Sequence, residues 1–138
     1  MSRPLGKPFV ILYFCCDPTV LSHHGVCLSN LGYRVINSNN GFETIKLSTS
    51  GQIDAAVLEL DRNHSDVLFI AQEIERVRAS IPVIVVVHAT QTLDGLRDLA
   101  DAVVPEDVDC GILVRSLEKL LPGAAASRPT GSAYSAEH

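Results

Sequence analysis

Two adjacent thiols, Cys15 and Cys16, lie in the stretch FCCDP, where a buried apolar run meets a loop that should open a helix. In a sheet with helices on both faces, this junction is the usual place for ligands and chemistry. Thiolates bind soft metals and undergo reversible oxidation. Glu59 and His88, which lie at or just past the ends of two other apolar runs, could complete a set of soft-metal ligands at the same edge.

A simpler interpretation assigns both thiols to packing, because a buried cysteine behaves as a small hydrophobic residue. We favour packing over a redox switch or a soft-metal site. The chain has four cysteines in all: Cys15, Cys16, Cys27 and Cys110. Their spacing matches neither a paired zinc-finger pattern nor the disulfide framework of a small secreted domain. A reducing, cytoplasmic location is therefore expected.

Five apolar runs, which alternate with stretches of helical period, would position these side chains. FVILYF, AAVLEL and PVIVVV are largely apolar along their whole length, as in parallel strands buried on both faces, and YRVIN and AVV are shorter. Helices are expected from Asp17 to Leu31, Asn40 to Ser50, Ser65 to Arg78, Thr92 to Ala100 and Asp109 to Leu121. The alternation predicts an α/β fold: a doubly wound, five-stranded parallel sheet in three layers, α/β/α.

The size and charge of the chain exclude several classes of function. With 138 residues, it suits one domain, expected at residues 8–121 between a short polar arm (1–7) and a polar, aperiodic tail (122–138) that we expect to be disordered. The net charge is −5 and no run of Lys and Arg occurs, which argues against nucleic acid as a partner. The longest apolar stretches are too short to span a membrane.

This pattern resembles the receiver domain of bacterial response regulators, of which single-domain chemotaxis regulators are examples. The resemblance covers residues 8–121 and is carried by VILYFCCDP, LGYRVINSNNGFETI, DAAVLEL and PVIVVVHA. It implies the flavodoxin-like receiver fold. It also implies a phosphorylation site in which acids after the first strand hold Mg²⁺ and an aspartate ending the third strand accepts the phosphoryl group. A hydroxyl residue, a lysine and an aromatic residue complete that site.

Carried over residue by residue, the resemblance places other residue types at each of these positions: Cys15 and Cys16 for the acid pair, Glu59 for the nucleophile, Val87 for the hydroxyl residue, Val103 for the aromatic and Glu106 for the lysine. Asp17 matches the position after the acid pair. A thiol is a poor ligand for Mg²⁺, and Glu106 reverses the charge that a lysine would supply. We therefore expect no phosphoryl transfer, no enzymatic activity, and no bound Mg²⁺ or other cofactor.

The resulting prediction is a stand-alone, degenerate receiver domain, or pseudo-receiver, in two-component (phosphorelay-type) signal transduction. It would act as a phosphorylation-independent interaction module. A protein partner or a second copy would bind the face formed by the fourth helix, fifth strand and fifth helix, near residues 92–121. Leu68 and Phe69 lie off the apolar stripe of the third helix and could be exposed to a partner.

Two alternative functions stay open. The first is a thiol redox or soft-metal sensor that uses Cys15 and Cys16. The second is a residual phospho-acceptor at Asp61, two residues past Glu59. Glu59 itself could mimic a phosphorylated aspartate, although a solvated carboxylate at the end of a strand is the simpler interpretation.

Overall fold

The computed structural model describes residues 8–15, 23–50, 52–60, 64–77, 81–87, 95, 97–105 and 110–121. The predicted arm and tail lie outside these ranges. The strands of the described part are β1 (Val10–Phe14), β2 (Arg34–Ser38), β3 (Ala55–Glu59), β4 (Val83–Val87) and β5 (Ala102–Pro105). Its helices are α1 (His23–Asn30), α2 (Gly41–Ser48), α3 (His64–Val77) and α4 (Cys110–Leu120).

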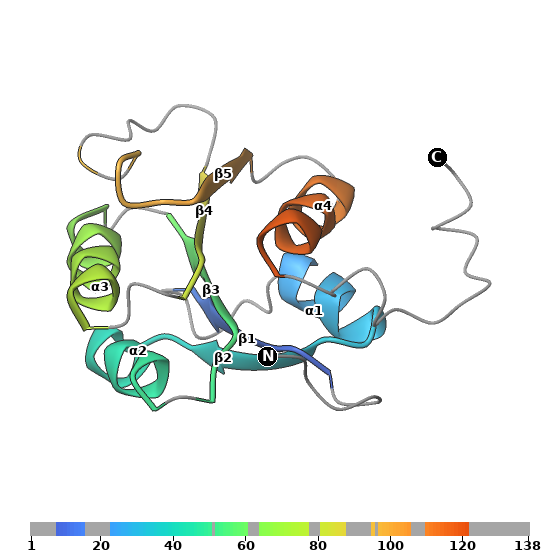
Figure 1. The fold of residues 1–138 in the computed structure, drawn as a ribbon, viewed down its shortest axis with the longest axis horizontal. Coiled ribbons are helices and arrows are strands. Elements are labelled where there is room, and N and C mark those ends of the chain that lie inside the picture. The colour runs from blue at the N-terminus through green and yellow to red at the C-terminus, as the bar shows by residue number, and fades with distance from the viewer. Residues whose placement is uncertain are drawn as a thin grey trace.

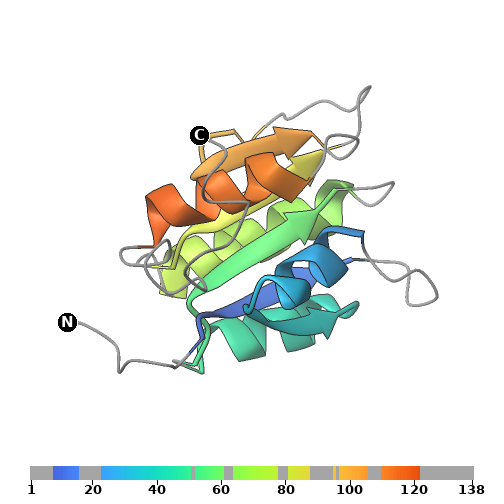
Figure 2. The ribbon, with the colours of Figure 1, turned by 90° about the vertical axis from the view of Figure 1, so that its right-hand side faces the viewer.

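The strands form one parallel sheet in the order β2-β1-β3-β4-β5. Helices α1 and α4 cover one face of the sheet, and α2 and α3 cover the other, which makes three layers (Figures 1 and 2). The prediction of a doubly wound α/β/α sheet is confirmed. Because β1 lies between β2 and β3, the winding changes direction there, and a crevice is expected beyond the carboxyl ends of β1 and β3.

Two apolar clusters fill the spaces between the layers, because successive side chains of a strand point to opposite faces of the sheet. On the α1–α4 side the cluster includes Ile11, Tyr13, Val57, Ile84 and Leu113. On the α2–α3 side it includes Phe14, Leu58, Val85, Ile70 and Ile74. Both faces of β1, β3 and β4 are buried, which explains why their sequences read as apolar runs rather than as an alternation of apolar and polar residues.

The ends of the first two helices follow signals that the sequence carries. Gly32, at φ 101°, adopts the left-handed conformation after α1, and the Tyr33 N–H donates to the Leu28 carbonyl oxygen at 3.1 Å. At the start of α2, the Asn40 Oδ1 accepts a hydrogen bond from the Glu43 N–H at 3.0 Å. These contacts satisfy backbone groups that a helix leaves without intrahelical partners.

The predicted helix from Thr92 to Ala100 is wrong for the residues of that stretch that the structure describes. Gly95 and Arg97–Leu99 form turns, and residues 92–94 and 96 lie outside the described ranges. Gly95 has φ 79°, a left-handed conformation that interrupts a right-handed helix. A Cβ at this glycine would lie 3.4 Å from the Cδ1 of Leu68, an ordinary van der Waals contact, so the turn lies beside α3.

Two aspartates hold the amino ends of neighbouring strands together. The Oδ2 of Asp54 accepts a hydrogen bond from the Val10 N–H at 2.7 Å, and the Asp54 N–H donates to the Val10 carbonyl at 2.8 Å. Asp101 makes the same pair of bonds with Val83, each at 2.7 Å. Each carboxylate thereby continues the hydrogen bonding of the sheet past the end of a strand.

Replacing Asp101 with alanine is expected to lower the free energy of unfolding by about 1–2 kcal/mol, because the Val83 N–H loses a charged acceptor. Urea denaturation would measure the change. Asp98→Ala removes an exposed aspartate three residues away and serves as the control, with an expected change within about 0.5 kcal/mol. Equal losses in the two variants would contradict a specific role for the Asp101 carboxylate.

Candidate functional site at the carboxyl ends of the strands

Cys15 and Glu59 lie at the carboxyl ends of two adjacent strands. Phe14 pairs with Leu58 in the register of β1 and β3, so the next residue of each chain segment, Cys15 and Glu59, comes at the same level. Alternation along the strands places both residues on the α1–α4 side of the sheet, where Tyr13 and Val57 also lie. The structure thus brings together the positions that the sequence assigned to a metal-binding acid and to the nucleophile.

Glu59 is held by a buried tyrosine. The Tyr13 hydroxyl donates a hydrogen bond to the Glu59 Oε1 at 2.7 Å, and the Tyr13 side chain is fully buried. Glu59 itself is half-buried. The predicted strand-end carboxylate is thus partly exposed, and one of its oxygens also accepts a hydrogen bond from the core.

Sequence reasoning missed Tyr13 as a member of this candidate site, although a signal for it exists. Tyr13 is the only residue of VILYF with a polar side-chain atom, and a buried tyrosine hydroxyl usually has a hydrogen-bond partner. Which partner it has could not be read from the sequence, because Tyr13 and Glu59 are 46 residues apart.

Cys15 is half-buried and packs against the α1–α4 cluster. Its N–H donates to the Ser38 carbonyl oxygen at 3.0 Å, which ties the end of β1 to the end of β2. The neighbouring positions Cys16 and Asp17 lie outside the described residues. Cys15 thus takes part in apolar packing at the place where the resemblance implies an acid.

The remaining predicted positions do not join this group in the described part of the chain. Val87 is half-buried and packs against the α2–α3 cluster, on the other face of the sheet, while Val103 is half-buried within β5. Opposite Glu59 in the register of β4 stands Val86, which is fully buried. The other positions named from the sequence lie outside the described residues: Asp61, His88 and Glu106.

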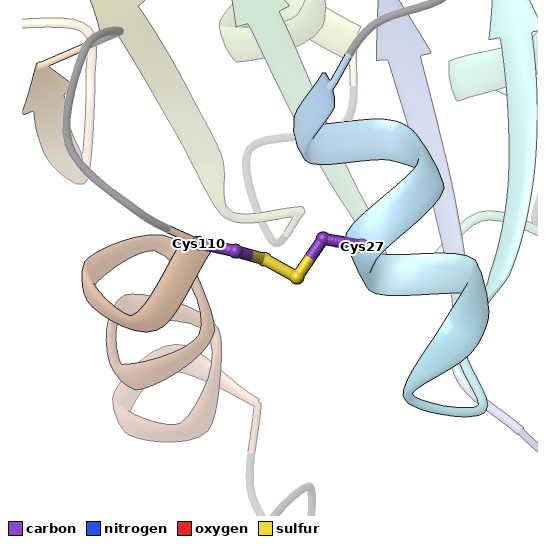
Figure 3. The surroundings of a disulfide bond; sticks show 2 residues. All are labelled: Cys27 and Cys110. Atoms are coloured by element: carbon purple, nitrogen blue, oxygen red, sulfur yellow. A yellow bond between two sulfur atoms is a disulfide. The ribbon is translucent and has the colours of Figure 1, made fainter.

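A disulfide links Cys27 of α1 to Cys110, the first residue of α4 (Figure 3). The cysteine spacing did not predict this pair, because the two residues are 83 positions apart and meet only when both helices pack on one face of the sheet. The Cα–Cα distance is 6.4 Å, within the range that a disulfide spans. The sequence carries one signal for the inward position of Cys27, because Leu28 and Leu31 share a helical stripe with it.

A second surface feature lies on the α2–α3 layer. Phe69 is 45% exposed, which confirms the expectation for that residue, whereas Leu68 is half-buried against the α2–α3 cluster. Phe69 contacts Phe42 of α2 edge to face, with the ring centroids 6.4 Å apart, and Phe42 is 78% exposed. An aromatic pair therefore lies at the surface on the side of the sheet opposite the disulfide.

Solved structures with this architecture come from response regulators and related receiver domains. The response regulator TrrA of Thermotoga maritima, in complex with Mg²⁺ and BeF, is 23% identical; the match covers 82% of this chain and 99% of TrrA, with a TM-score of 0.68. The receiver domain of the sensor histidine kinase PA1611 of Pseudomonas aeruginosa, with magnesium in its active-site cleft, is 20% identical, with coverages of 83% and 98% and a TM-score of 0.69. The chain has the receiver fold. TrrA has also been solved in complex with the histidine kinase ThkA. The matched chain of that complex is 23% identical to this chain, with a TM-score of 0.69. The match covers 82% of this chain and 98% of TrrA.

Sequence comparison adds two transcriptional regulatory proteins, GlrR of Escherichia coli K12 and QseF of Escherichia coli O157:H7. Each is 28% identical over 79 residues, which is 57% of this chain. The aligned stretch spans only 18% of the length of either regulator. No family model matches the sequence. The expected flavodoxin-like receiver fold is confirmed by the structural matches.

Two of the matched structures contain magnesium, so the side chains at the ends of β1 and β3 can be compared with the ligands that this ion requires. Mg²⁺ takes oxygen ligands in near-octahedral geometry. At the ends of β1 and β3 the described residues offer the Cys15 sulfur, a soft ligand, and the Glu59 carboxylate, one oxygen of which accepts the Tyr13 hydroxyl. Within the described ranges, no three His, Cys, Asp or Glu side chains gather as a metal site would require. Of these two donors only the Glu59 carboxylate is a ligand type that Mg²⁺ prefers, and Cys16, Asp17 and Asp61 lie outside the described residues. Separately, no helix in the described part of the chain is long and apolar enough to cross a membrane.

Proposed function

We propose that this chain is a receiver-type module of two-component signalling that acts through contact with another protein and needs neither phosphorylation nor Mg²⁺. The observation that carries the proposal is the pairing of Glu59 with the buried Tyr13 hydroxyl, next to a thiol at Cys15. A receiver that accepts a phosphoryl group needs a carboxylate oxygen turned toward the donor and a cation beside it. Here one oxygen of the Glu59 carboxylate accepts a hydrogen bond from the buried Tyr13, and the neighbouring residue, Cys15, carries sulfur, which is a soft ligand.

The side-chain chemistry supports the same conclusion. Glutamate carries its carboxylate one methylene further from the backbone than aspartate, so the oxygen that would attack is displaced. Phosphoryl transfer depends on positioning and on neutralising charge that is shared among the phosphoryl oxygens. The sequence places Glu106 where the resemblance implies a lysine, and a second negative charge would oppose that neutralisation.

The proposed contact surface is the face that contains β5 and α4, near residues 92–121. Arg115 and Lys119 are exposed on α4, so this helix offers two positive charges to a partner. A partner with an acidic surface would be steered toward them. The complex of TrrA with ThkA supports a kinase or another signalling protein as the class of partner, and a second copy of this chain is the competing possibility.

The experiment that tests the proposal is intact-mass measurement after incubation with acetyl phosphate and Mg²⁺, with TrrA as the positive control. We expect TrrA to gain the mass of one phosphoryl group and this chain to gain none. A phosphoryl adduct that disappears in Asp61→Asn would instead establish the residual acceptor. An adduct that survives Asp61→Asn and disappears in Glu59→Gln would show that the Glu59 carboxylate is reactive and would overturn the proposal.

A second arm of the experiment addresses the thiols at the end of β1. The protein is treated with a thiol reagent, and the rate of alkylation at Cys15 and Cys16 is followed by mass spectrometry of the peptides. We expect slow labelling of Cys15, because its side chain is half-buried against the α1–α4 cluster. Rapid labelling, or zinc that remains bound through dialysis, would favour a thiol or soft-metal sensor.

A further inference from the structure

The Cys27–Cys110 bond joins two helices that already pack against each other. Cys27 is half-buried in α1, and Cys110, the first residue of α4, is only 6% exposed. Both belong to the α1–α4 cluster, in which Leu28 and Leu113 are fully buried. The apolar contacts of these helices hold the two sulfur atoms within bonding range, so the bond can open and close without rebuilding the core.

We infer that Cys27 and Cys110 form a reversible thiol–disulfide exchange site that reacts with low-molecular-weight disulfides and dithiols. Cys27 is less buried than Cys110, so a small reagent would reach the Cys27 sulfur first, and Cys110 would then react with its neighbour. Cys110 lies at the amino terminus of α4, where the helix dipole favours a thiolate, the form that attacks a disulfide. The pair does not include Cys15, and the inference does not depend on the proposed function.

Glutathione disulfide can oxidise the Cys27 and Cys110 thiols in two steps. The Cys27 thiolate attacks one sulfur of glutathione disulfide, which forms a mixed disulfide and releases one glutathione thiolate. The Cys110 thiolate then attacks the Cys27 sulfur, which forms the Cys27–Cys110 bond and releases the second glutathione. Two protein thiol protons pass to solvent or to the glutathione thiolates, and two electrons pass to glutathione. A dithiol reverses both steps.

Oxidation is expected to restrict the motion of α4 relative to α1. The bond fixes the first turn of α4 to the middle of α1 (Figure 3). In the dithiol form this cross-link is lost, so we expect the turn to open more often. The bond also joins residues 83 positions apart, and cross-links between residues far apart in the sequence restrict the unfolded chain most. Redox state should therefore change both the local opening of α1 and α4 and the stability of the domain.

The test follows the protein across a series of ratios of reduced to oxidised glutathione. The test uses the double variant Cys15→Ala/Cys16→Ala, in which only Cys27 and Cys110 can react. After an acid quench the free thiols are alkylated, and the intact mass gives the number of alkyl groups. We expect a change from two alkyl groups to none as the ratio becomes oxidising, and full reversal with dithiothreitol. Peptide mapping of the native sequence by tandem mass spectrometry repeats the measurement if the double variant does not fold.

Hydrogen exchange and thermal unfolding give the second readout. Reduction is expected to speed amide exchange in 23–30 and 110–114, to leave α3 unchanged, and to lower the Tm by roughly 10 °C. In Cys110→Ser, redox state should change neither quantity. Three results would each overturn the inference: two free thiols at the most oxidising ratio, a bond that resists excess dithiothreitol, or the same exchange pattern in both redox states.

Discussion

Ile84→Ala is expected to lower the free energy of unfolding by about 4 kcal/mol, because it removes methyl and methylene groups from the centre of the sheet. Ile84 is fully buried on β4, between β3 and β5, and its side chain faces the α1–α4 cluster. The strands on either side cannot move inward to fill the space without breaking their hydrogen bonds. The variant therefore loses the transfer free energy of the side chain and also keeps a cavity.

Urea denaturation of the oxidised protein would measure this loss. The midpoint should fall by about 2 M at an unchanged slope, since small domains have urea slopes of about 1–3 kcal/mol/M. Val77→Ala is the matched control, because it also trims a β-branched residue but at a position that is 40% exposed at the end of α3. We expect less than about 1 kcal/mol there. A loss below about 1 kcal/mol for Ile84→Ala would contradict the packing of this face.

The second large effect is expected at the hydrogen bond between Tyr13 and Glu59. Tyr13→Phe should lower the free energy of unfolding by about 2 kcal/mol, because a half-buried carboxylate loses the hydrogen bond from this hydroxyl while the shape of the ring stays the same. Bonds to charged acceptors are stronger than neutral ones, which places this loss above that of an ordinary tyrosine hydroxyl.

A double-mutant cycle isolates that bond from the other roles of the two side chains. Tyr13→Phe, Glu59→Ala and the double variant would be compared by urea denaturation, with an expected coupling of about 1–2 kcal/mol between the two sites. Additive losses would mean that the hydroxyl and the carboxylate do not stabilise each other. Such a result would remove the observation on which the proposed function rests.

Tyr13→Phe also separates two reasons for the expected lack of phosphoryl uptake. If the hydrogen bond alone kept Glu59 from reacting, the variant would gain a phosphoryl group from acetyl phosphate and Mg²⁺. We expect no gain, because Cys15 remains a soft ligand and Glu59 keeps its longer side chain. Intact mass of the variant beside the unchanged protein decides between the two.

The residue pattern by itself determined the strands, the three-layer fold and the residue types at the ends of β1 and β3. Strands β1, β3 and β4 begin and end within about one residue of an apolar run, because a strand buried on both faces needs a continuous apolar sequence. Gly32 and Asn40 marked helix ends for equally local reasons: one supplies a left-handed conformation and the other a capping oxygen. Such signals act between residues a few positions apart, so they can be read along the chain.

Only the tertiary structure decided which distant side chains meet. Tyr13 reaches Glu59 because the register of β1 and β3 places them on one face, and Cys27 meets Cys110 because two helices pack on that same face. Neither contact leaves a periodic trace in the sequence, since each depends on how separate elements align in space. The apolar residues of Thr92–Ala100 suited a helix, but in its described part Gly95 adopts a left-handed conformation, φ 79°, that belongs to a turn.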